Sequence, residues 1–192
     1  SSPVNAERDI KNLLEKGRSD TFDWAEEQSP VELIATIMVA MANHQGGMLA
    51  SGISGGDKPY ITGVHDSAET IDRVLESALS LDPPLIIPLP DVITVEGKHI
   101  IITRIPSGMP HVYSLGGRYL ARNGSSNEAL KPRDLRRLMI ERGEIHFEAE
   151  IAFGTSLDDN DWEKAADYVK NLKAMGKAGV EDVLAQRGCL AR

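Results

Sequence analysis

Arginine is the residue type in this sequence that points most directly to chemistry, because a guanidinium can donate two parallel hydrogen bonds to one phosphate or carboxylate. Residues 97–146 hold nine lysines and arginines against four acids, whereas the rest of the chain holds 12 bases and 25 acids. The net charge is -8, so the chain as a whole is no general polyanion binder. The pattern predicts a local phosphate-binding surface, and the alternative interpretation is a solvated helix face.

Arg122 is the central residue of that predicted surface. It follows an apolar segment and precedes Gly124 and Ser125, so loop N–H groups could join its guanidinium around a phosphate. Arg118 stands four residues earlier, on the same face of a strand predicted for residues 118–122. Pairing of Arg122 with an acid such as Glu26 or Asp57 is the alternative. The predicted nucleic-acid contacts are Arg104, Arg118, Arg122, Arg133 and Arg137.

A glycine pair at residues 46–47 raises the question of a nucleotide-binding loop. Both the P-loop and the dinucleotide-binding loop require a strand before the glycines and a helix after them, whereas here a helical pattern comes first. The pair is therefore predicted to be a tight turn after a helix that ends near Asn43. Ser125 and Glu128 have the spacing of a helix capping box. The predicted loop or turn residues are Asn43, Gly46, Gly47, Gly124 and Ser125.

Other catalytic arrangements are absent from the sequence. No two histidines have the i, i+4 spacing of a metal-binding helix, and no serine lies in a G-x-S-x-G context. We therefore predict no cofactor and no metal. Cys189 is the single cysteine, which fits a reducing cytoplasm, and no apolar run is long enough to span a membrane. Because Ser1 is not preceded by a methionine, a fragment of a longer protein is expected.

Hydrophobic periodicity predicts the elements that position these residues. Helices are expected at residues 5–16, 31–43, 66–80 and 132–142, and strands lie between them, including two around a turn at residues 96–98. This order predicts an α+β fold with a mixed or antiparallel sheet flanked by helices. Residues 1–146 form the predicted domain. Residues 147–192 are predicted to be a helical extension or the start of a second module, with helices near 160–174 and 179–187.

The order of several motifs resembles the Schlafen-type AlbA-like domain, formerly called a divergent AAA domain. The motifs are "FDWAEE", "LIATIMVAMANHQGGMLASGI", "ITGV" and "PHVYSLGGRYLARNGSS", and the resemblance covers about residues 10–145. It implies an interaction with nucleic acid, DNA or RNA, in a bacterial helicase-related transcriptional regulator. Because Schlafen-like domains tend to pair, it also implies a homodimer.

Some Schlafen proteins are metal-dependent endoribonucleases, and the resemblance allows a comparison with their Glu-x-x-x-x-Glu-Phe-Lys pattern. Here Arg18 stands at the first Glu position and Asp23 at the second, followed by Trp24 and Ala25, and Ser54 stands near an expected Asp. Carboxylates are needed there to hold a hard divalent cation. Most of them are missing, so catalysis is not expected.

Three functional hypotheses follow. The leading one is a non-catalytic domain that binds DNA through phosphate contacts. The second is a protein-interaction or oligomerisation module, which the apolar segment "LIIPLPDVI" and the net acidity favour. The third is a metal-dependent nuclease or a nucleotide-hydrolysing enzyme.

Overall fold

A computed structural model describes residues 3–152, which form two compact units. The first unit contains residues 3–108 and 112–130, and the second contains residues 109–111 and 131–152. Each unit is described by itself below.

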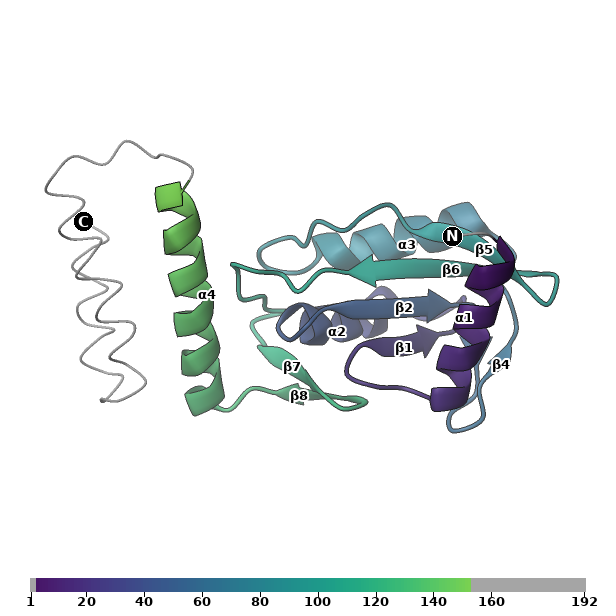
Figure 1. Ribbon diagram of the computed structural model, residues 1–192, viewed down its shortest axis with the longest axis horizontal. Coiled ribbons are helices and arrows are strands. Elements are labelled where there is room, and N and C mark those ends of the chain that lie inside the picture. The colour runs from purple at the N-terminus through teal and green to yellow at the C-terminus, as the bar shows by residue number, and fades with distance from the viewer. Residues whose placement is uncertain (1–2, 153–192) are drawn as a thin grey trace, which may run out of the picture. The chain divides into compact units, whose positions relative to one another are not determined.

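Four strands form the main sheet of the first unit, in the order β1 (Phe22–Ala25), β2 (Gly47–Ser51), β6 (Lys98–Ile105) and β5 (Asp91–Val95). β1 and β2 run parallel, and the other neighbours run antiparallel (Figure 1). Two small hairpins accompany the sheet, formed by β3 (Ile53–Ser54) with β4 (Tyr60–Ile61) and by β7 (Leu120–Asn123) with β8 (Ser126–Ala129). The predicted α+β class with a mixed sheet is confirmed.

Helices cover both faces of the sheet. In Figure 1, α1 (Pro3–Lys16) lies in front of the strands, and α2 (Val31–Ala42) and α3 (Ser67–Leu79) lie behind them. Side chains alternate between the faces of a strand, so Leu49 packs in the core beside α2 and α3 while Ala50 packs in the core beside α1. Burial on both faces explains why all four residues of β1 are buried.

The glycine pair is required by the protein's own packing. Gly46 has a φ of +76°, and a Cβ atom there would lie 2.4 Å from the Ile105 carbonyl oxygen. A Cβ atom on Gly47 would lie 2.7 Å from the Thr21 carbonyl oxygen. Close backbone approach therefore accounts for both glycines where α2 turns into β2.

Asn43 follows α2 and is buried. Its Nδ2 donates to the carbonyl oxygens of Tyr113 and Leu120, both at 2.8 Å, and its Oδ1 accepts from the Tyr113 N–H at 2.8 Å. One side-chain amide thus joins the end of α2 to the segment that leads into β7.

The segment after residue 117 differs from the sequence-based prediction. The strand comprises Leu120–Asn123, so Arg118 lies outside it, and the predicted loop that follows contains β8. Gly124 and Ser125 form a two-residue turn between these strands, and the φ of +58° at Gly124 suits the first position of a type II′ turn. Ser125 and Glu128 therefore do not cap a helix, contrary to the capping-box prediction.

The helix of the second unit is α4 (Pro132–Ala152), which continues past residue 142, where it was predicted to end. The helices predicted near 160–174 and 179–187 lie outside the described residues, as does Cys189. Over residues 3–152, no helix combines the length and the apolar character needed to cross a membrane.

Candidate nucleic-acid interface

Arg122 is buried, and its guanidinium is fully engaged by the protein. Its side chain is 0% exposed. Nη1 donates to Oδ2 of Asp23 and to Oδ1 of Asn127, both at 2.8 Å. Nε and Nη2 donate to the Ser19 carbonyl oxygen at 3.0 and 2.9 Å, and Nη2 also reaches the Phe22 carbonyl oxygen at 3.3 Å. Arg122 therefore ties the β7–β8 hairpin to β1 and leaves no donor facing solvent for a phosphate.

The acid that pairs with Arg122 is Asp23, and not Glu26 or Asp57. Asp23 is 6% exposed, and its Oδ1 accepts from Nε of Arg18 at 2.6 Å and from the Trp24 N–H at 2.7 Å. The Arg18 guanidinium also lies 4.1 Å from the centre of the Trp24 ring, a cation–π distance. One carboxylate thus faces two guanidinium groups, which leaves one positive charge over in this cluster.

This cluster does not suit the divalent cation that the Schlafen nuclease pattern would require. Both oxygens of Asp23 already accept hydrogen bonds from arginines, and those positive charges would repel a metal ion. Ser54, near the position of the expected third carboxylate, has its Oγ 3.4 Å from Oγ1 of Thr62. Within residues 3–152, no group of three or more histidine, cysteine, aspartate or glutamate side chains could hold a metal.

Arg118 is exposed and lies apart from Arg122. It belongs to a tight turn closed by backbone hydrogen bonds with Leu115, and its side chain is 58% exposed. Nη2 is 3.7 Å from Oε1 of Glu32 in the first turn of α2. An exposed ion pair at this distance is weak, so the Arg118 guanidinium remains available to a phosphate. The predicted shared strand face of Arg118 and Arg122 is not formed.

Arg104 projects from β6 on the side of the sheet that carries α1. Its side chain is 57% exposed, and Nη2 lies 3.8 Å from Oδ2 of Asp91. It lines a groove of about 580 Å³ between α1 and the sheet, together with Asp9, Asp91 and Met48. Two carboxylates against one guanidinium make this groove a poor site for a phosphate chain. Arg104 and Arg118 also lie on opposite sides of the sheet, so the first unit does not gather the predicted arginines on one surface.

Arg133 and Arg137 lie on α4, in the second unit. Both are exposed, and a separation of four residues places them on one side of the helix. Neither forms an ion pair with a described side chain, and the exposed Lys131 lies just before the helix. Of the predicted contacts, these two arginines form the pair that is both exposed and close together.

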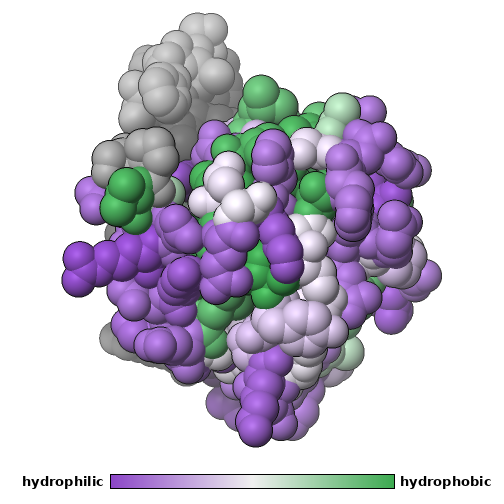
Figure 2. Space-filling model, turned by 90° about the vertical axis from the view of Figure 1, so that its right-hand side faces the viewer, coloured by the Kyte–Doolittle hydropathy of each residue, from purple (hydrophilic) through white to green (hydrophobic). Residues whose placement is uncertain are grey.

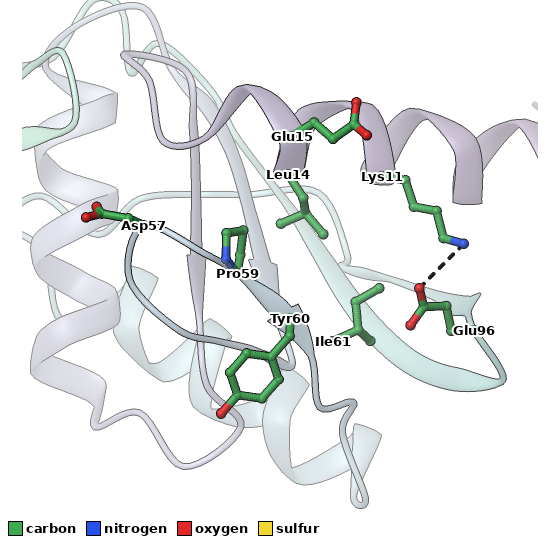
Figure 3. A pocket seen from close by; sticks show the side chains of 8 residues that line it. All are labelled: Lys11, Leu14, Glu15, Asp57, Pro59, Tyr60, Ile61 and Glu96. Atoms are coloured by element: carbon green, nitrogen blue, oxygen red, sulfur yellow. Dashed lines mark ion pairs between the residues drawn. The ribbon is translucent and has the colours of Figure 1, made fainter.

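The first unit also contains a pocket whose charged lining residues are mainly acidic. It has a volume of about 390 Å³ and lies between α1, the β3–β4 hairpin and the β5–β6 turn. Figure 3 shows Glu15, Asp57 and Glu96 around it, with Lys11 paired to Glu96 at 3.5 Å. On the side of the molecule drawn in Figure 2, hydrophobic residues reach the surface between hydrophilic ones. Three carboxylates and one lysine would repel phosphate, so this pocket is not part of a nucleic-acid interface.

Two features of the cluster around Asp23 were not predicted from the sequence: the burial of Arg122 and the pairing of Arg18 with Asp23. Arg122 lies two residues after the buried Leu120, so both side chains share the inward face of β7, and that spacing was the signal of burial. The pairing of Arg18 with Asp23 had only a weak signal, because five residues in a loop do not define a distance.

Residues 6–131 match the family described as Schlafen, AlbA_2. The chain therefore belongs to this family, and its membership indicates a nucleic-acid-related domain. Among curated proteins, none matches the sequence.

Two solved structures superpose on this chain. The DIP2311 protein from Corynebacterium diphtheriae superposes with a TM-score of 0.51 and 17% identity, over 73% of this chain and 28% of that one. The N-terminal domain of a RecG-related protein from Nitrosomonas europaea superposes with a TM-score of 0.47 and 18% identity, over 69% of this chain and 96% of that one. The chain thus spans less than a third of the DIP2311 protein, with which it shares a fold.

Proposed function

We propose that this chain is a non-catalytic, cytoplasmic domain that binds DNA as part of a transcriptional regulator. The observation that carries the proposal is the exposed pair Arg133 and Arg137 on one side of α4, without described carboxylate partners. Membership of the Schlafen, AlbA_2 family supports a nucleic-acid ligand. The regulatory role comes from the resemblance of the motifs alone. In this proposal residues 1–146 form the binding domain, and the residues after them form an extension or a second module.

Phosphate contacts are the chemistry that this arrangement supports. Arginines on an exposed helix face can follow a phosphate backbone without reading base sequence, and each contact releases condensed counterions. Within the first unit, Arg118 is an exposed guanidinium that a phosphate can reach, whereas Arg104 is outweighed by two carboxylates of its groove. Arg122 is a positioning residue, because its guanidinium donors hold the β7–β8 hairpin against β1 and none is left for a phosphate.

The acidic remainder of the chain confines the ligand. Outside residues 97–146, acids outnumber bases by 13, and three carboxylates surround the pocket beside α1. A polyanion is repelled by such surfaces over roughly one Debye length, about 8–10 Å at physiological salt. Binding should therefore be local and sensitive to salt.

Fluorescence anisotropy with labelled duplex DNA and with single-stranded RNA of equal length, at two salt concentrations, tests the proposal. We expect binding to duplex DNA that weakens as salt rises. Absence of DNA binding at low salt would refute the proposal. If the protein then bound the RNA probe, its ligand would be RNA instead of DNA. Magnesium- or manganese-dependent cleavage of either probe would refute its non-catalytic part.

A further inference from the structure

β5 is an edge strand with one open side. β6 pairs with its inner side, and no other strand among residues 3–152 pairs with it (Figure 1). Over the same residues, no backbone hydrogen bond outside the ladder with β6 involves β5. Such an edge is a template for an added strand unless prolines or charges block it. Here the prolines come before the strand, at Pro88 and Pro90, and Asp91 is the strand's only charged residue.

The turn after β5 defines which backbone groups point outward. Val95 and Lys98 flank a two-residue turn with φ values of 52° and 73°, the pattern of a type I′ hairpin. The residues that flank such a turn form a hydrogen-bonded pair, and hydrogen-bonded and non-bonded pairs then alternate. The N–H and C=O groups of Val92 and Thr94 therefore face the open side.

The groove between α1 and the sheet reaches this strand. Residues 91–94 of β5 line it, together with Ile10 and Leu13 of α1 and Met48 of β2. Ile93 packs on the core cluster that contains the α1 residues, so the side chains of β5 point alternately toward α1 and away from it. Both sets can line one groove only where it meets the backbone of the strand. An open sheet edge beside a pocket for alternate side chains is the combination by which domains bind extended peptides.

The charges of the groove favour a cationic ligand. Asp9 and Asp91 line it as exposed carboxylates, and Asp9 forms no ion pair with another described side chain. Arg104 offsets one of them, but its Nη2 lies 3.8 Å from Oδ2 of Asp91, and an exposed contact at that distance is weak. Outside residues 97–146 acids outnumber bases by 13, so the surrounding surface also attracts positive charge.

We propose that an extended peptide segment of another protein adds to β5 as an antiparallel strand, with an apolar residue followed two positions later by a lysine or arginine. Antiparallel pairing is slightly more stable per residue than parallel pairing. The peptide residues opposite Val92 and Thr94 exchange hydrogen bonds with them, so all four outward groups are satisfied. The peptide residue opposite Ile93 points toward α1, and the one opposite Asp91 points the same way.

Each of these two peptide side chains meets a matching part of the groove. The apolar one packs on Ile93, and the cation lies beside Asp91, with Asp9 in the same groove. β5 of a second copy does not match this pattern, because its Ile93 is followed two positions later by Val95 and not by a cation. This inference does not rest on nucleic-acid binding.

Fluorescence anisotropy of three labelled synthetic peptides with the 192-residue chain tests the proposal. The first peptide, TTTITKTT, carries an isoleucine and, two positions later, a lysine. The second, TTTITETT, has glutamate in place of the lysine. The third, TTTIKTTT, has the composition of the first but places the lysine on the opposite face of the strand.

Two variants are aimed at the site. Thr94→Pro removes an outward N–H and leaves the ladder with β6 intact, because proline is tolerated on the free side of an edge strand. Asp91→Lys reverses the charge opposite the lysine of the peptide. Asp72→Lys is the matched control, an equal charge reversal at an exposed position of α3, on the other side of the sheet. Circular dichroism verifies that each variant folds.

The first peptide should bind the wild type and Asp72→Lys about fivefold more tightly than the other two peptides do. Thr94→Pro should weaken its binding at least about tenfold. In Asp91→Lys the preference should reverse, so that the glutamate peptide binds more tightly than the lysine peptide.

Three results would overturn the proposal. The first is no binding of any peptide to the wild type at about 1 mM. The second is equal affinity for the first and third peptides, or binding that Thr94→Pro leaves unchanged, because the peptide would then lie elsewhere. The third is a wild-type dimer that excludes the peptide, because a second copy would then occupy the edge.

Discussion

Arg122 and Asp23 form a buried ion pair, with Nη1 and Oδ2 2.8 Å apart and side chains 0% and 6% exposed. The two residues are 99 positions apart in sequence and join β7 to β1. The pair has the hydrogen bonds that a buried charge needs, because the remaining donors of Arg122 reach carbonyl and amide oxygens. The pair fixes the β7–β8 hairpin against β1 in the first unit.

Removal of this arginine should destabilise the fold strongly. Arg122→Ala leaves a buried carboxylate with one cation in place of two, and breaking a buried pair costs about 3–5 kcal/mol. Arg122→Lys should recover only part of this loss, because it restores the positive charge but one ammonium cannot replace three guanidinium nitrogens. Urea denaturation measures the change in the free energy of unfolding.

Arg118→Ala is the matched control for that comparison, since it deletes an arginine that is 58% exposed. Its effect on the free energy of unfolding should stay within about 0.5 kcal/mol. Equal losses in the free energy of unfolding for Arg118→Ala and Arg122→Ala would show that the buried pair stabilises the fold no more than an exposed arginine does.

The fold class could be predicted because hydrophobic periodicity reports on burial. The continuous apolar pattern of residues 31–42 became α2, and the segments around the Glu96-Gly97 turn became β5 and β6. β8 was missed because "SNEA" has no apolar alternation, and its residues are mostly exposed. A strand held by its turn and its hydrogen bonds leaves no hydrophobic signal in the sequence.

The candidate site was harder to predict than the fold. Arg122 was predicted to contact a phosphate because it follows an apolar segment and precedes Gly124 and Ser125, and Leu120 two residues earlier was the signal that its side chain faces inward. Its partner Asp23 lies so far away in sequence that no local pattern could connect them. By contrast, helical periodicity alone predicts that Arg133 and Arg137, four residues apart, lie on one side of a helix.

Glu27 should make stability depend on pH. Burial raises the pKa of this carboxyl, but hydrogen bonds from the Asp66 N–H, the His65 side chain and the His65 N–H outweigh it, so the pKa is lowered overall. A lowered pKa contributes stability above the unfolded-state value of about 4.3, and that contribution is lost as the pH falls through the folded-state pKa. Glu27→Gln should therefore lower the free energy of unfolding more at pH 7 than at about pH 3. Chemical denaturation at both pH values measures this, and an equal loss at the two would contradict the prediction.

Thr103→Val should stabilise the protein. Thr103 is fully buried on β6, and its hydroxyl has no hydrogen-bond partner among residues 3–152. Valine keeps the shape and removes an unsatisfied polar group, which is worth about 1 kcal/mol or more. Thermal unfolding should show a higher Tm, and a lower Tm would indicate that a buried water satisfies the hydroxyl in the native protein.

Divalent cations should not bind at Asp23, because both of its oxygens accept from arginines. Addition of about 1 mM Mn²⁺ should leave the Tm of the wild type unchanged. A rise in Tm that Asp23→Asn abolishes would show that the cluster opens to admit a metal.

The central claim is that exposed arginines on α4 contact phosphates, and the salt dependence of DNA affinity in a double variant tests it most directly. Arg133→Ala/Arg137→Ala is compared with Arg8→Ala/Lys16→Ala, which removes the same charge from exposed positions of α1. We expect the α4 variant to lower the slope of log affinity against log salt by about 2 and the α1 variant to leave it unchanged. Equal slopes in the wild type and both variants, or the same decrease in both variants, would contradict the account.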